Sequence, residues 1–386
     1  MTPAGDHVEH EKQARFDRLT WVDAAKGISI VLVVVGHAFS WLAAAGYATS
    51  SPFGINEALA NMRLPLFFFA SGLFAASLLE GSWRRLFSKR LALLAWVFFL
   101  WQFIDIGYTL VVGIVIRGAP VGDVVHEAAW KPFESIVRPM NELWFLWALC
   151  IMFIVVKLLW KLPVTVRLFA VLTPALIMNS LDPAQEALVQ ESMNLGWVGL
   201  FNYTFVFMLA ALLGKPAAVK IGRVNALVAT AAALGAGAAL LCAPLVNWGI
   251  FDIVFIFVGL AFGISIALLT QRLGWLRAIG RNTLPIYVMH TTLLIAVIVG
   301  LLITGIDLNA IRGAAYWAPI ALAITVTAAS LAIHAAYRRS GTQGLFELPT
   351  SFRPIPAGDA TSNPGTPSTA GRSNTFSDNT RDRENA

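Results

Sequence analysis

Two residues with complementary chemistry, Lys26 and His37, stand eleven residues apart in one apolar stretch. Eleven residues of α-helix turn through about 1100°, within ~20° of three full turns, and rise roughly 16 Å. The two side chains therefore lie on one helix face. A neutral imidazole is a general base suited to neutral pH, whereas an ammonium group attracts anions. We predict a cation at one end of this face and a titratable base farther along it.

The composition determines what kind of structure positions these two side chains. Hydrophobic residues make up 57% of the 386 residues, and charged residues make up only 13%. This balance excludes an ordinary soluble globular domain. We predict an all-α, polytopic membrane protein.

Apolar runs long enough to cross a hydrocarbon core of ~30 Å recur along the chain. We predict about ten transmembrane helices, at residues 24–45, 62–79, 91–116, 142–160, 164–181, 196–214, 223–243, 248–270, 284–304 and 315–337. An even number of spans places both termini on the same side of the membrane.

The Lys and Arg residues of the short loops indicate the orientation, because they are enriched on the cytoplasmic side. With a cytoplasmic N-terminus, the inner loops hold Arg84, Arg85, Lys89, Arg90, Lys157, Lys161, Arg167, Lys215, Lys220, Arg223, Arg272, Arg277 and Arg281. The outer loops hold fewer, namely Arg63, Arg117, Lys131, Arg138 and Arg312. We therefore predict a multi-pass protein of the cell membrane with cytoplasmic N- and C-termini. Its basic balance reflects contact with membrane lipids, and nucleic acid binding is not expected.

Three regions follow from this topology. They are a cytoplasmic N-terminal segment at 1–20, the transmembrane domain at 21–339, and a disordered, polar cytoplasmic tail at 340–386. The longest outer loop, about 117–141, is too short for an added enzymatic module. Cys150 and Cys242 lie within spans, so neither a disulfide framework nor a Cys-ligated metal is expected.

The residues around Lys26 and His37 belong to a longer pattern. The string Trp21-Val-Asp23-Ala-Ala-Lys26-Gly27 precedes Val35-Gly36-His37, and Met62-Arg63-Leu-Pro65-Leu-Phe67-Phe68-Phe69-Ala-Ser71-Gly72 follows. Later segments are Asn141-Glu142-Leu-Trp144-Phe145 and Gly280-Arg281-Asn282-Thr283-Leu-Pro-Ile-Tyr287-Val-Met-His290. Together they resemble the bacterial family-3 integral-membrane acyltransferases, and most of all the branch related to fucose 4-O-acetylase. The resemblance covers about residues 16–337.

This resemblance implies transfer of an acyl group, usually acetyl from acetyl-CoA, to a hydroxyl of an extracytoplasmic glycan or lipid-linked sugar. It implies acyl-CoA as co-substrate, no bound cofactor, and an essential histidine at the position of His37. Two departures from the family pattern concern the donor. Lys26 stands where the family commonly has arginine, and it supplies a point charge without a bidentate fork. The run Arg90-Leu-Ala-Leu93 lacks the second arginine of the family's Arg-x-x-Arg motif.

Ionisable and hydrogen-bonding residues make up the candidate site. His37 is the expected general base, with Asp105 or Glu142 as a carboxylate that fixes its tautomer and stabilises the imidazolium. Donor binding is assigned to the basic residues Lys26, Arg84, Arg85, Lys89 and Arg90. Acceptor or oxyanion binding is assigned to Arg63, Asn141, Asp252, Tyr287 and His290, of which Arg63 and Asn141 are the oxyanion donors. No metal site is expected.

Simpler interpretations exist for the same residues. The basic residues 84–90 fit ordinary anchoring at the inner surface, and an intramembrane histidine can simply hydrogen-bond a neighbouring helix. Phe67, Phe68 and Phe69 are expected to face lipid or to pack, and Trp144 to anchor at the membrane interface. A proton-coupled sugar or lipid transporter or flippase is the alternative function, with the intramembrane His and Asp residues as a proton relay.

Overall fold

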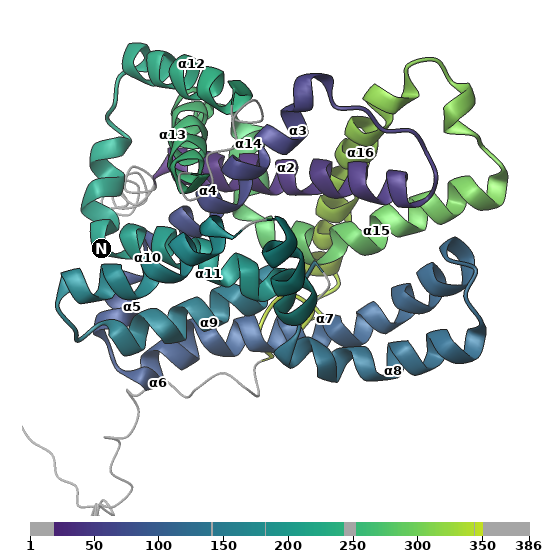
Figure 1. The fold of residues 1–386 in the computed structure, drawn as a ribbon, viewed down its shortest axis with the longest axis horizontal. Coiled ribbons are helices and arrows are strands. Elements are labelled where there is room, and N and C mark those ends of the chain that lie inside the picture. Colours follow the sequence, from purple (N-terminus) through teal and green to yellow (C-terminus); the bar gives the residue numbers. More distant parts are fainter. Residues whose placement is uncertain (1–18, 140–141, 182, 243–251, 343, 350–386) are drawn as a thin grey trace, which may run out of the picture.

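In the computed structural model, residues 19–139, 142–181, 183–242, 252–342 and 344–349 are described. All regular elements in these ranges are helices, which confirms the predicted all-α class (Figure 1). They are α2 Thr20–Ala44, α3 Ile55–Ala58, α4 Ala60–Gly72, α5 Ala76–Glu80, α6 Trp83–Leu86, α7 Ala92–Val111, α8 Val121–Val137, α9 Trp144–Leu159, α10 Val164–Ser180, α11 Pro183–Ile221, α12 Ala226–Cys242, α13 Asp252–Thr270, α14 Gly274–Arg281, α15 Thr283–Thr304 and α16 Ala314–Arg339. Short 3₁₀ turns cover Pro52–Gly54 and Leu308–Ala310, and π-helical turns cover Phe87–Leu91 and Val112–Ile116.

Among the described residues, six helical stretches are long and apolar enough to cross a membrane. They are Thr20–Ala44, Trp83–Ile116, Gly196–Ile221, Ile253–Thr270, Thr283–Thr304 and Ala314–Arg339. The apolar helices α9, α10 and α12 are shorter. The second predicted span is divided, because α4 ends at Gly72 and α5 begins at Ala76. The chain is therefore a polytopic membrane protein, whereas the number of ten spans is not confirmed.

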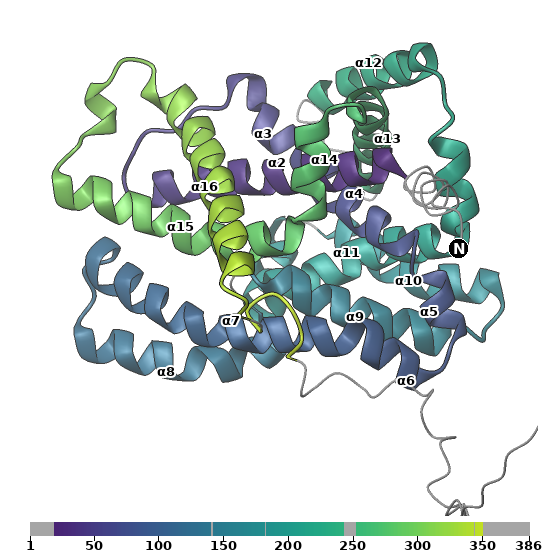
Figure 2. The same cartoon turned by 180° about the vertical axis from the view of Figure 1, so that it is seen from behind.

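Helix α2 is surrounded by other helices of the chain and packs against α4, α13, α14, α15 and α16 (Figures 1 and 2). Small residues permit such contacts, since helices in membranes associate mainly through van der Waals packing. Gly280 of α14 meets the backbone carbonyl of Asp23, where a larger residue would clash. Beside this contact, Arg281 Nε donates to Asp23 Oδ2 at 2.9 Å. Helix α2 is thus held on several sides and positions the side chains along it.

Helices α7 and α8 form an antiparallel hairpin along one edge of the molecule (Figure 1). Most of the connection that we predict at 117–141 is helical, since Val121–Val137 forms a helix that packs against α7. A search for long apolar runs does not find α8, because this helix is amphipathic and charged. Its Val124 is buried, while Trp130 and Phe133 are exposed. One face of α8 packs on the protein, and the other is apolar and exposed.

The chain after α16 returns to the helices. Residues 344–349 lie within the segment that we expected to be disordered, yet Phe346 is buried and its ring packs near that of Trp101. The indole N–H of Trp101 also donates to a backbone carbonyl of this segment at 3.0 Å. The buried ring of Phe346 thus holds the beginning of the segment 340–386, whose overall composition is polar, against the helices. Residues 350–386 of the predicted tail and 1–18 of the predicted N-terminal segment lie outside the described ranges.

Candidate active site

One face of α2 lines three pockets in succession. The lining residues on this face are Lys26, Ile30, Val33, His37, Trp41 and Ala44. Their spacing of three or four residues is that of a single helix face. From Lys26 to Ala44 the helix rises roughly 27 Å, close to the ~30 Å thickness of a hydrocarbon core. The face predicted from Lys26 and His37 therefore continues toward the end of the helix.

The first pocket, which we call the cationic pocket, has a volume of about 140 Å³ and contains the basic side chains of Lys26 and Arg90. Most of its remaining wall is apolar and includes Leu93 of α7. Lys26 Nζ lies 5.9 Å from the ring centroid of Phe74, and the Arg90 guanidinium lies 5.9 Å from that of Phe153. Two cations that share an apolar enclosure suit an anionic ligand group.

Arg90 occupies the π-helical turn Phe87–Leu91, which leads into α7. Such turns are rare and are found frequently at functional sites. The other basic residues predicted to bind the donor are exposed and do not line the cationic pocket; they are Arg84, Arg85 and Lys89. Of that cluster, the structure brings only Arg90 together with Lys26.

The second pocket, which we call the histidine pocket, has a volume of about 180 Å³. Its polar side chains are those of His37, Arg63, Glu142 and Tyr287. The other lining residues are Ile30, Val33, Leu64, Phe67, Trp144 and Phe145. A base, a carboxylate and a guanidinium thus meet in a mostly apolar enclosure, where electrostatic interactions are stronger than in water.

The two pockets adjoin at an aromatic wall. Phe67, Phe145 and Tyr287 line both of them. The rings of Phe67 and Phe145 meet edge to face with centroids 4.8 Å apart, and those of Phe145 and Tyr287 are 5.5 Å apart. Phe67 was expected to face lipid or to pack, and the structure places it between two pockets. Trp144, expected at the membrane interface, is buried beside the histidine pocket.

Glu142 is the carboxylate that lies near His37. Its Oε1 is 3.9 Å from His37 Nδ1 and accepts a hydrogen bond of 3.0 Å from the indole N–H of Trp41. Asp105, the other candidate, is buried on α7 and does not line either pocket. Glu142 lies in the connection between α8 and α9. No local sequence pattern predicts that a residue of this connection lies beside His37.

Residues of α15 hold the turn that contains Glu142, through hydrogen bonds to its backbone. The Tyr287 hydroxyl donates to the backbone carbonyl of Glu142 and accepts from the backbone N–H of Phe145 at 3.2 Å. His290, one turn farther along α15, is fully buried, and its ring centroid lies 5.1 Å from that of His37. The His290 Nδ1 contacts the Tyr287 carbonyl oxygen. The structure thus brings Tyr287 and His290 to the same place as His37 and Glu142.

Arg63 reaches the histidine pocket from α4. Its Nη1 donates to Asn56 Oδ1 at 3.2 Å, and its guanidinium lies directly over Gly36. A side chain at position 36 would collide with the guanidinium. Glycine immediately before His37 therefore gives Arg63 access to the pocket.

Two predicted residues have no described side chain. Asn141 lies outside the described residues, and Asp252 begins α13 without a described side chain. The lining residues that sequence reasoning missed include the aromatic residues Trp41 and Phe145. Trp41 follows His37 by one helical turn, so its place on the same face was available from the spacing. Within the described ranges, no group of three or more His, Cys, Asp or Glu side chains is placed to hold a metal ion.

A comparison with known protein families identifies the family of the chain. Residues 19–338 match the model of a family described as an acyltransferase domain, and the chain belongs to acyltransferase family 3. The match identifies the family and not a branch within it. No curated protein and no solved structure matches the chain. The protein is a multi-pass membrane acyltransferase.

Proposed function

We propose that this acyltransferase moves an acyl group, most simply acetyl, from acyl-CoA on the cytoplasmic side to a hydroxyl of an extracytoplasmic glycan or glycolipid. The observation that carries the proposal is the aromatic wall between two pockets. On one side of this wall lie the cations Lys26 and Arg90, and on the other lie His37 and Glu142. An acyl-CoA has the same two-part character, with anionic phosphates far from a reactive thioester.

The donor enters with its acyl end first. Lys26 and Arg90 bind phosphate oxygens of CoA, and the exposed basic residues of α6 and the π-helical turn attract the anionic donor to the inner surface. The adjoining pockets of about 140 and 180 Å³ hold the narrow acyl-pantetheine arm as far as the phosphates at Lys26 and Arg90, and the adenosine part lies outside them. Leu93, where the family has its second arginine, lines the cationic pocket. The charge there comes from Lys26 and Arg90.

His37 acts as the general base. Glu142 Oε1 lies 3.9 Å from Nδ1, so its negative charge favours a proton on that nitrogen, and Nε2 then accepts the proton of the acceptor hydroxyl. The acceptor oxygen bonds to the thioester carbonyl carbon, the carbon–sulfur bond breaks, and the imidazolium returns its proton to the CoA thiolate. The products are the acylated acceptor and free CoA. Arg63 stabilises the negative charge that develops on the carbonyl oxygen.

Direct transfer is favoured over an acyl-enzyme on serine, threonine or cysteine. Among the described residues that line the histidine pocket, none is of these three types. The Tyr287 hydroxyl also lines the pocket, but it donates its proton to the backbone carbonyl of Glu142. The acceptor oxygen is therefore the nucleophile that His37 activates.

Replacement of His37 with Ala tests this proposal. The full-length variant is reconstituted in proteoliposomes with radiolabelled acetyl-CoA and envelope glycans from the native host. Loss of a general base lowers rates by about 10²–10⁴-fold, and we expect a loss of this size. His126→Ala is a matched control, because this histidine is exposed on α8 and lines none of the three pockets. Undiminished glycan acylation by the folded His37 variant would contradict the proposal.

The alternative of a proton-coupled transporter or flippase has one observation in its favour, the adjacent rings of His37 and His290. Neighbouring imidazoles can pass a proton between them. Membership in an acyltransferase family favours acyl transfer. Proton-coupled sugar uptake by vesicles that lack any acyl donor would favour the transporter instead.

A further inference from the structure

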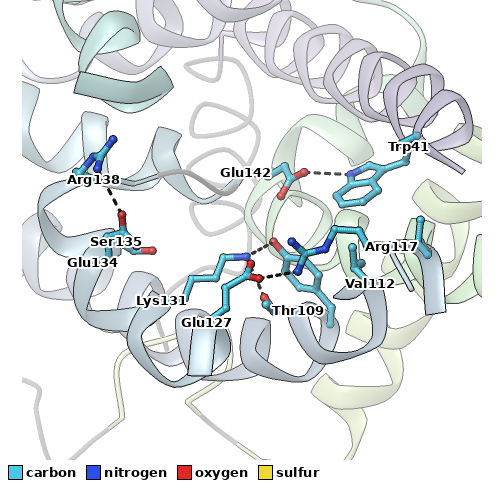
Figure 3. A pocket seen from close by; sticks show the side chains of 13 residues that line it. Trp41, Thr109, Val112, Arg117, Glu127, Lys131, Glu134, Ser135, Arg138 and Glu142 are labelled. Carbon is cyan, nitrogen blue, oxygen red and sulfur yellow. Dashed lines mark hydrogen bonds and ion pairs between the residues drawn. The ribbon is translucent and has the colours of Figure 1, made fainter. Parts of the chain in front are cut away.

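A third pocket adjoins the histidine pocket at Glu142, and we call it the α8 pocket. Its volume is about 420 Å³. Small-ligand sites typically measure about 300–1,000 Å³. Its walls come from the C-terminal part of α2, the end of α7 and the polar face of α8 (Figure 3). Glu142 lines both pockets, so a ligand in the α8 pocket lies next to the carboxylate whose Oε1 is 3.9 Å from His37 Nδ1.

The charges of the α8 pocket are balanced. Arg117 and Glu127 form an ion pair with an N–O distance of 2.6 Å, and Arg138 and Glu134 form one of 3.7 Å. Lys131 Nζ donates to the hydroxyl of a threonine of α7 at 2.9 Å. The lining contains three basic and three acidic side chains. The pocket therefore offers many hydrogen-bonding groups without selecting a strongly charged ligand.

Two aromatic rings complete the pocket, those of Trp41 and Tyr108. Lys131 Nζ lies 4.9 Å from the centroid of the Tyr108 ring. A sugar matches such a lining, since its C–H faces pack on aromatic rings while its hydroxyls pair with charged groups. The indole N–H of Trp41 points to Glu142, as Figure 3 shows. A sugar ring that packs on Trp41 thus presents its hydroxyls next to Glu142 and the histidine pocket.

The opposite face of α8 is apolar and exposed. Its exposed apolar residues are Val121, Val125, Trp130, Phe133, Ile136 and Val137. In a membrane protein, an amphipathic helix with such a face contacts lipid. The α8 pocket is therefore bordered by a helix whose other side is an exposed apolar face suited to contact with lipid.

We propose that the α8 pocket is the acceptor site and that it binds a sugar without strong net charge. This inference rests on the proposed function, because the hydroxyl bound there is the one that His37 deprotonates. Free and lipid-linked sugars share this chemistry, and the test below separates them.

The experiment uses the full-length protein in proteoliposomes with radiolabelled acetyl-CoA. The acceptor probes are methyl and octyl glycosides of glucose, galactose, fucose and N-acetylglucosamine. Two rates are measured, acetyl transfer to the glycoside and release of free acetate without acceptor. Glu127→Gln and Lys131→Gln are expected to raise the KM for the glycoside about tenfold, as for a lost hydrogen bond to a charged group. Acetate release in wild type and in the His37→Ala variant reports on the donor half of the reaction separately from acceptor binding.

Two further variants serve as controls. Asp123→Asn removes an exposed carboxylate of the same helix that does not line the pocket, and it should change neither rate. Lys131→Arg keeps the charge and should retain most of the glycoside affinity. Thermal unfolding of each purified variant establishes that it is folded.

The outcomes separate this inference from the proposed function. A lower KM for octyl than for methyl glycosides supports the site with a lipid-linked acceptor, and the reverse supports it with a free sugar. Unchanged glycoside KM values in folded E127Q and K131Q would overturn the α8 pocket as acceptor site. So would a failure to acylate any glycoside while acetate release still depends on His37. Wild-type rates in the His37→Ala variant would instead overturn the proposed function.

Discussion

The cationic pocket and the histidine pocket share three aromatic residues, yet their polar groups differ. The first contains the cations Lys26 and Arg90, and none of its described lining residues is acidic. The second combines His37 with Glu142 and Arg63. Cations alone favour the binding of an anion, whereas a base beside a carboxylate favours proton transfer. Under the proposed function, donor binding and chemistry occur at separate positions along the α2 face, so substitutions in the two pockets should change different kinetic constants.

The largest effect that would sharpen this comparison is expected from Glu142→Gln. Glutamine keeps the size of the side chain and can still accept from Trp41, but it cannot stabilise the imidazolium with a negative charge. We expect kcat to fall about 100-fold, with the KM for acetyl-CoA nearly unchanged. Glu142→Asp should recover part of the activity. A raised donor KM with normal kcat would show that the division between the pockets is wrong.

Substitutions in the cationic pocket should give the opposite pattern. Lys26→Gln and Arg90→Gln are each expected to raise the KM for acetyl-CoA about tenfold, because a charge-assisted contact to phosphate is lost. The value of kcat should change little. Lys89→Gln provides the comparison, since Lys89 is exposed and solvent screens its charge. Equal effects of Lys89→Gln and Arg90→Gln on the KM for acetyl-CoA in steady-state assays would contradict the assignment of Arg90 to donor binding.

The shared wall should control the size of the acyl group. Phe67→Ala opens space beside the proposed position of the thioester. We expect the ratio of kcat/KM for butyryl-CoA to kcat/KM for acetyl-CoA to rise about fivefold. An apolar pocket changes kcat/KM by this factor or more for each additional methylene that it accepts or rejects. Phe69→Ala is the matched control, because Phe69 is buried on the same helix but lines neither pocket. It should lower thermal stability without changing the ratio. A shift of equal size in both variants would exclude a specific role for Phe67.

The smallest effect is expected at Trp41. Trp41→Phe keeps an aromatic ring but removes the N–H that donates to Glu142. Because Glu142 keeps its negative charge and loses only one hydrogen bond that positions it, kcat should fall about threefold to fivefold, or roughly 1 kcal/mol. Trp41→Leu should in addition raise the acceptor KM, because the ring surface is lost. Identical kinetics for the Phe and Leu variants would argue against stacking of the acceptor on this ring.

The helix face itself could be predicted because helical periodicity is local. Lys26 and His37 fall on one face by their spacing alone, and the structure places pockets along that face. Trp41 and Ala44 continue the same period and could have been found by the same reasoning. The aromatic wall was harder to predict from the sequence, because a run of Phe residues in a membrane helix usually indicates packing.

The choice between Glu142 and Asp105 could not be made from the sequence, because it depends on how distant helices meet. Glu142 stands beside His37 in the turn before α9, and Tyr287 of α15 holds that turn by hydrogen bonds to its backbone. None of these contacts is local in sequence. Helix α8 was missed for a different reason, since a search for long apolar runs passes over an amphipathic helix.

The central claim is that the donor reaches His37 along the α2 face, and protection of one position on this face tests it most directly. Val33 lies between Lys26 and His37 and lines the histidine pocket. The Val33→Cys variant is labelled with N-ethylmaleimide in proteoliposomes, and mass spectrometry reads the adduct at the introduced thiol, with the exposed Cys242 as internal reference. We predict that acetyl-CoA strongly slows labelling at the introduced thiol but not at Cys242, and that adding Lys26→Gln weakens this protection. Equal labelling with and without saturating acetyl-CoA would contradict the account.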